Sequence, residues 1–180
     1  MNTNLPSPGP VALGAAADAE KNVGVKEDPP FSNDGKWIRM YQNAVNPPLP
    51  AGSPWCACFV RYRLEAAAKA INHPLPSDFP DSGWCPDYQD WGKQHKLWIP
   101  SSSMARCNAQ RGDLCLFWFD AKERVAHIGI VVGTWDGGVI TVEGNTTDGV
   151  TVQREGDGVY RRKRSWSAFG SGGGFVRLCF

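Results

Sequence analysis

The character of the chain changes at Arg111, and this change limits the possible folds more than any other feature of the sequence. The segments before it predict helices, among them an Ala-rich segment with apolar positions at helical spacing (11–23) and one rich in Ala, Leu, Arg and Glu (55–71). These expected helices span residues 11–23, 36–45, 55–71 and 83–95. The segments after it are short runs of Val, Ile, Phe and Trp divided by Gly-containing turns, which predict strands. The expected strands span residues 114–119, 126–132, 139–143, 150–154, 159–162 and 175–179. Helices followed by a meandering sheet predict an α+β fold, with N-terminal helices packed on a C-terminal antiparallel β-sheet.

The length of the chain predicts one globular domain, and its net charge bears on the class of partner. The chain has 180 residues, and residues 1–10 are Pro-rich and polar, so we expect a flexible arm at 1–10 and a single domain at 11–180. Nineteen Lys and Arg residues against 18 Asp and Glu residues give a net charge of +1, which does not favour a nucleic acid partner. No run approaches the roughly 18 apolar residues of a membrane span.

The N-terminus and the cysteines bear on the compartment. Residues 1–19 lack the basic and apolar regions of a secretory signal peptide, so we expect synthesis in the cytoplasm. The chain has six cysteines, and reduced thiols are the expectation for a protein of that compartment. A bridge between Cys85 and Cys107 is the alternative if the protein reaches an oxidising compartment. The states of Cys58, Cys115 and Cys179 stay open.

Cys56 is a candidate nucleophile because of its place in a helix. Ser53 and Pro54 suit the N-cap and first position of that helix, which places Cys56 at the third position. There the backbone N–H groups and the helix dipole lower the pKa of a thiol and stabilise an oxyanion. The alternative is a buried cysteine that only fills space. Cys58, two residues further on, is expected to point into the core.

His127 and Glu143 are candidates for the base and its orienting acid. Alternation along residues 125–133 places His127, Gly129 and Val131 on one face of a strand, away from the aliphatic core face. The next strand places Glu143 where its carboxylate can accept a hydrogen bond from the imidazole. Asn145 follows that strand and either assists His127, binds substrate or forms a turn. The other histidines, His73 and His95, lack this context and fit surface positions.

Five segments in order resemble one enzyme family. They are SPWCACFV (53–60), GWCPDYQDW (83–91), RGDLCLF (111–117), AHIGIVVG (126–133) and VEGNT (142–146). Together they resemble the CHAP family, the cysteine- and histidine-dependent amidohydrolases/peptidases related to the NlpC/P60 papain-like enzymes. The resemblance spans roughly residues 12–179.

The resemblance implies a papain-like fold and hydrolysis of amide bonds in peptidoglycan. Cys56 would be the nucleophile and oxyanion donor, His127 the base, Glu143 its orienting acid and Asn145 a helper or substitute. The enzyme would be an endopeptidase or an N-acetylmuramoyl-L-alanine amidase that acts in the periplasm or cell wall. It would reach the wall as a phage-type lysin or as an injected antibacterial effector, the latter with a cognate immunity protein. The alternatives are a non-catalytic wall-binding protein and a cysteine protease or amidase with another substrate.

The remaining sequence features do not predict a metal site or a charged binding surface. The loop at residues 46–53 carries no acid, so the calcium site of some CHAP members is not expected, and the cysteine spacing does not suit zinc. No cofactor or metal is expected. The basic run at residues 161–164 is expected to be a solvated strand end. Tryptophan residues are expected mainly in the core, with one or two lining a cleft; they are Trp84, Trp91, Trp98, Trp118 and Trp135.

Overall fold

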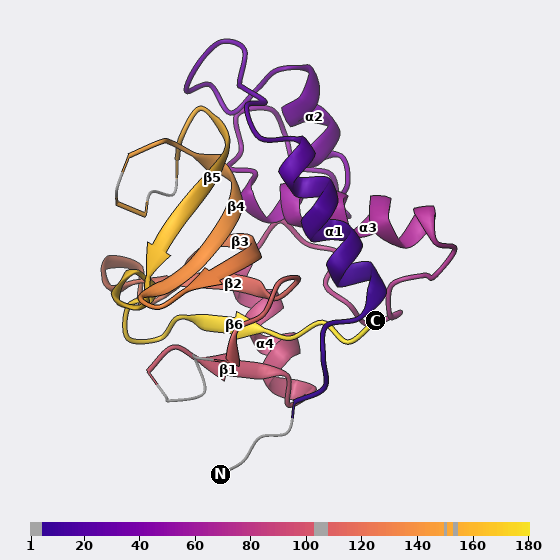
Figure 1. Cartoon of the computed structure of the whole chain (residues 1–180). Helices are drawn as coiled ribbons and strands as arrows, with labels where there is room; N and C mark the ends of the chain where they lie inside the picture. Colours follow the sequence, from indigo (N-terminus) through magenta and orange to yellow (C-terminus); the bar gives the residue numbers. More distant parts are fainter. Residues whose placement is uncertain (1–4, 103–107, 150, 153–154) are drawn as a thin grey trace.

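A computed structural model describes residues 5–102, 108–149, 151–152 and 155–180. Within these residues, four helices come first and six strands follow, as the α+β prediction requires (Figure 1). The helices are α1 (Pro10–Lys21), α2 (Lys36–Gln42), α3 (Cys56–Ala70) and α4 (Cys85–Gln94). The strands are β1 (Trp98–Pro100), β2 (Leu114–Phe119), β3 (Arg124–Trp135), β4 (Gly138–Thr146), β5 (Gly158–Ser165) and β6 (Gly174–Val176). Short 3-10 helices η2 (Asp120–Lys122) and η3 (Trp166–Phe169) lie after β2 and β5.

The strands form one antiparallel sheet in the order β1-β6-β2-β3-β4-β5. Five of the six expected strands are confirmed with small changes of boundary, and β1 was not expected. Of the expected strand at 150–154, three residues lie outside the described ones, and Thr151 and Val152 are not in a strand. The helices lie on one side of the sheet (Figure 1), where α3 contacts β3 and β4. No described helix is both long and apolar enough to cross a membrane.

The sheet is buried on both faces. Alternate residues of the central strands, such as Ile128 and Val142, join the main core beneath the helices. The intervening residues, such as Phe117 and Val139, join a second cluster with Phe169. The expectation that the face of His127 is open is therefore wrong, because this second cluster covers it and His127 is fully buried.

A buried ion pair ties the two ends of the chain to the sheet. Arg177 donates to both carboxylate oxygens of Asp113, at 2.5 and 3.1 Å, and both residues are buried. Arg177 also donates to the carbonyl of Pro6, and the Gly9 N–H donates to the carbonyl of Leu178. The second half of the expected arm at 1–10 is thus bonded to the C-terminal segment, and Pro10 already belongs to α1.

Candidate active site

Cys56 is the first residue of α3. The N-cap is Trp55, with φ −126°, and no side chain caps the helix, so the expectations of a Ser53 cap and of Cys56 at the third position are wrong. The first position of the helix also favours a thiolate, because the N–H groups of the whole first turn lack intrahelical acceptors and stabilise a nearby anion. The Ala57 N–H, next along this turn, helps to lower the Cys56 pKa.

Buried polar side chains hold the turn that delivers Cys56. The Gln42 amide donates to the carbonyls of Ser53 (2.8 Å) and Asn33 (3.0 Å). The Trp55 indole N–H donates to the Glu27 carboxylate at 2.8 Å, and Glu27 also accepts the Asn33 N–H at 3.0 Å. Glu27, Gln42 and Trp55 are all buried. These bonds fix the start of α3, a role that no local pattern around Glu27 or Gln42 indicates.

His127 and Glu143 form the expected pair between β3 and β4. The His127 Nε2 atom lies 2.9 Å from Glu143 Oε2, and both side chains are fully buried. Extended by one residue, the register that places Ile130 opposite Val142 puts Gly129 opposite Glu143. A Cβ atom on Gly129 would lie 2.6 Å from Glu143 Cγ, so the glycine makes room for the acid. Glu143 therefore lies across Gly129 and reaches diagonally to His127.

Arg164 completes this pair, and the sequence reasoning missed it. Its Nε and Nη2 atoms donate to the two carboxylate oxygens of Glu143 at 2.8 and 2.6 Å. The Thr141 hydroxyl donates to Glu143 Oε1 at 2.6 Å. The expectation that residues 161–164 are a solvated strand end is wrong at Arg164, which is 1% exposed, and holds for Arg161. The signal was available, because alternation along β5 predicts that Arg164 and Arg161 face opposite sides of the sheet.

The charges of the site favour an ion pair between thiolate and imidazolium. Burial opposes ionisation of Glu143, but Arg164 and His127 outweigh it and hold the Glu143 pKa well below its ordinary value. Burial would likewise lower the pKa of His127, but hydrogen bonds and charge from Cys56 and Glu143 raise it to about 9. A hydrogen bond from Cys85, with a further contribution from His127, lowers the Cys56 pKa well below its ordinary value. Since Nε2 of His127 is bonded to Glu143, the buried Nδ1 atom is the nitrogen left to serve Cys56.

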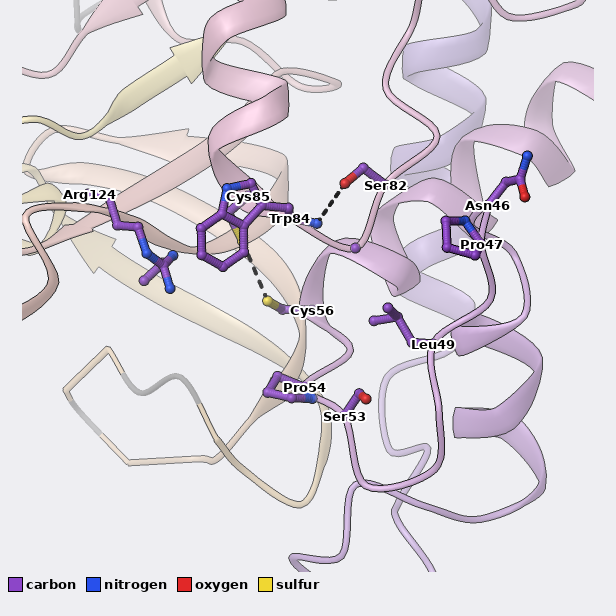
Figure 2. Close-up of a pocket in the computed structure, with 12 residues that line it drawn as sticks. Asn46, Pro47, Leu49, Ser53, Pro54, Cys56, Ser82, Trp84, Cys85 and Arg124 are labelled. Carbon is purple, nitrogen blue, oxygen red and sulfur yellow. Dashed lines mark hydrogen bonds between the residues drawn. The ribbon is translucent and has the colours of Figure 1, made fainter.

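Cys85 is an unexpected neighbour of Cys56. It is the first residue of α4, and its sulfur lies 3.7 Å from the Cys56 sulfur (Figure 2). Cys58 is fully buried, as expected, and burial raises its pKa to about 12, so it is not a rival nucleophile. Cys107, the expected partner of Cys85 in an oxidised protein, lies outside the described residues.

A cleft of about 390 Å³ opens beside Cys56 (Figure 2). Its lining comes from the loop before α3, the start of α4 and the start of β3: Asn46, Pro47, Leu49, Ser53, Pro54, Cys56, Ser82, Gly83, Trp84, Cys85, Arg124 and Ala126. The Trp84 side chain is 49% exposed, and the Arg124 guanidinium lies 3.8 Å from the centre of its ring. Among the described residues, no acid forms an ion pair with Arg124. Trp84 thus fulfils the expectation of a tryptophan that lines a cleft.

The remaining candidate residues lie apart from this cleft. Asn145 has a positive φ of 54°, and its side-chain oxygen accepts the Gly156 N–H at 3.1 Å. The expectation that Asn145 follows the strand in a turn is wrong, because Asn145 lies within β4, where the register with β5 shifts between Glu143 and Thr146. Its side chain makes no hydrogen bond to His127 within the described chain. His95 pairs with Asp78 at 2.7 Å, and His73 is exposed.

The described residues contain no cluster of three or more His, Cys, Asp or Glu side chains arranged to hold a metal ion. Comparisons of the chain with protein-family models, with curated proteins and with solved structures find no match. The geometry of the site, together with the motif resemblance, therefore carries the functional argument.

Proposed function

We propose that the protein is a cysteine hydrolase that cleaves amide bonds in peptidoglycan, with Cys56, His127 and Glu143 as its catalytic machinery. The observation that carries the proposal is the chain of contacts from Arg164 through Glu143 to His127, which interacts in turn with Cys56 at the start of α3. A thiol next to an imidazole that a carboxylate orients is the arrangement for nucleophilic attack on a carbonyl.

The reaction follows from the ion pair. The Cys56 thiolate attacks the carbonyl carbon, and the Cys56 N–H at the start of α3 donates to the developing oxyanion. The His127 imidazolium gives its proton to the departing amine, which leaves a thioester on Cys56. Neutral His127 then takes a proton from water as the water attacks the thioester, and the acid product and the thiolate are released. Glu143 stabilises the imidazolium and fixes its ring, so that Nδ1 serves the reacting atoms.

The cleft supports a substrate that has both apolar and anionic parts. Most of its lining is apolar, and Trp84 offers an exposed ring of the kind on which sugars and peptide side chains stack. Arg124 adds a cation without an acidic partner among the described residues, which suits a carboxylate. Peptidoglycan stem peptides carry free carboxylates next to amide bonds. The similarity of residues 53–60 and 126–133 to CHAP motifs supports the same substrate.

The test is digestion of purified peptidoglycan and of defined muropeptides, with mass spectrometry of the products. We expect new ends only with active protein: a free lactyl group marks an amidase, and a new peptide end marks an endopeptidase. Cys56→Ala should be inactive. Cys58→Ala is the matched control, because it removes a buried thiol from the same helix.

Three outcomes would contradict the proposal. Cleavage of casein without cleavage of muropeptides would indicate a protease with another substrate. Binding to cell wall without products would indicate a non-catalytic protein. Full activity of Cys56→Ala would place the chemistry elsewhere.

A further inference from the structure

Two thiols meet in the cleft where two helices begin. Cys56 starts α3 and Cys85 starts α4, and both line the cleft. Their sulfur atoms lie 3.7 Å apart, and Figure 2 shows the two side chains directed toward each other. The proposed hydrolysis uses only one of these sulfurs as a nucleophile. Beyond the hydrogen bond that lowers the Cys56 pKa, the Cys85 sulfur takes no part in that reaction.

We propose that Cys56 and Cys85 form a reversible redox site, in which Cys85 traps the oxidised Cys56 as an intramolecular disulfide. The oxidant is a hydroperoxide, with hydrogen peroxide as the simplest member of the class. The inference rests on the proposed function only in taking Cys56 as a reactive thiolate, and it does not depend on the substrate.

The chemistry balances in two steps. The Cys56 thiolate attacks one oxygen of hydrogen peroxide and the O–O bond breaks, which gives a sulfenic acid and hydroxide. The hydroxide takes the proton that the His127 imidazolium had received from Cys56, and the first water forms. The Cys85 sulfur then attacks the Cys56 sulfur, the S–O bond breaks, and the departing hydroxide takes the proton of the Cys85 thiol. In sum, two thiols and one peroxide give one disulfide and two waters.

The geometry favours this second step over competing reactions. A disulfide bond is about 2.0 Å long, so the sulfurs need to approach by about 1.7 Å, a distance within the reach of side-chain rotation. Both residues lie in the first turn of a helix, where backbone N–H groups favour a thiolate. Cys58 and Cys115 are fully buried in the core, and neither lines this cleft. Cys85 is thus the described thiol placed to reach Cys56 first.

The disulfide would have two consequences for the enzyme. It would remove the nucleophile, so the oxidised protein is inactive until a dithiol reduces it. It would also protect Cys56, because a sulfenic acid that finds no thiol is oxidised further to sulfinic acid, which dithiols do not reduce.

The experiment treats the full-length protein with hydrogen peroxide and identifies the products by intact mass and by peptide mapping under non-reducing conditions. The expected product has lost two hydrogen atoms and yields a crosslinked peptide pair that contains Cys56 and Cys85. Dithiothreitol should restore the original mass and the alkylation of Cys56. Cys85→Ser should instead gain two oxygen atoms on Cys56, and dithiothreitol should not reverse that gain.

Controls separate this inference from other outcomes. Cys179→Ser removes an exposed thiol and should behave as wild type. Cys85→Ala repeats the test with a smaller side chain, and thermal unfolding of both Cys85 variants checks that they fold. A crosslink of Cys85 to Cys107, or sulfinic acid on Cys56 in the wild type at low peroxide, would overturn the inference. All readouts are chemical, so failure on peptidoglycan would not be mistaken for failure here.

Discussion

Replacement of Arg164 with Met tests whether a buried ion pair holds the acid of the site. Arg164 makes two hydrogen bonds to Glu143, at 2.8 and 2.6 Å, and neither residue is more than 1% exposed. The Met side chain fills similar space but, among the described residues, leaves the carboxylate with only His127 and Thr141 as hydrogen-bond partners. Removal of one member of a buried pair costs about 3–5 kcal/mol. We expect the free energy of unfolding at pH 7 to fall by about that amount.

The loss should depend on pH in a defined direction. Although burial opposes it, Arg164 and His127 hold the Glu143 pKa far below its ordinary value of 4.5. A depressed carboxyl pKa contributes stability that is fully present above 4.5 and is lost as the pH falls through the folded-state pKa. Arg164→Met should raise the Glu143 pKa and so lose part of this contribution to the free energy of unfolding. The difference between wild type and variant should therefore be largest at neutral pH and shrink below pH 4.5.

The assay is urea unfolding followed by tryptophan fluorescence at several pH values. Arg161→Met is the matched control, because Arg161 lies on the same strand and is exposed, and its effect should stay within about 0.5 kcal/mol. Arg164→Lys keeps the positive charge but cannot make the two paired hydrogen bonds. Its loss of unfolding free energy should lie between those of Arg161→Met and Arg164→Met. An Arg164→Met variant within about 1 kcal/mol of wild type at pH 7 would refute the reasoning.

Three further predictions concern the nucleophile, the cleft and the sheet. The rate of Cys56 alkylation should be nearly flat from pH 6 to 8, whereas an ordinary thiol gains about tenfold per pH unit. In His127→Gln the rate of Cys56 alkylation should again rise with pH. A rate that stays flat from pH 6 to 8 in this variant would contradict the ion pair. Arg124→Ala should lower kcat/KM about tenfold on muropeptides with free carboxylates but not on amidated ones, since a charged hydrogen bond contributes about 1.5–3 kcal/mol; equal losses on both would rule out carboxylate recognition. Gly129→Ala should lower the free energy of unfolding by about 1–3 kcal/mol, because its Cβ would lie 2.6 Å from Glu143 Cγ, and calorimetry measures the loss.

Local periodicity was enough to predict most of the sheet and the central pair of the site. The expected strand at residues 114–119 has the observed boundaries of β2. Alternation along two neighbouring strands was also enough to place Glu143 beside His127, because antiparallel neighbours joined by a short turn share a register. These features depend on residues close in the sequence. Local periodicity does not predict a contact between residues that are far apart in the sequence.

Cys85 and Glu27 illustrate that failure. Cys85 reaches Cys56 because α4 begins beside the start of α3, and no pattern within either helix encodes that meeting. The N-cap of α3 is Trp55 rather than the expected Ser53, and the cause is again a contact between residues distant in the sequence. A Ser-Pro pair is a common helix start, but the bond from Trp55 to Glu27 binds the residue after this pair into the core. A tertiary bond thus overrode a local preference.

The second core cluster has the greatest consequence for the chemistry. It draws on Phe169, which lies outside every expected helix and strand, and on Phe175, at the start of the strand expected at residues 175–179. No pattern in the sequence indicated that these side chains cover this face. The cover places the Glu143 carboxylate and its partners away from water, where their attraction is stronger than at a surface. Only the Cys56 end of this chain of contacts lines the cleft. A hydrophobic layer that plays no direct part in the proposed reaction therefore keeps the acid ionised through fixed partners, and the imidazole is ready before substrate arrives.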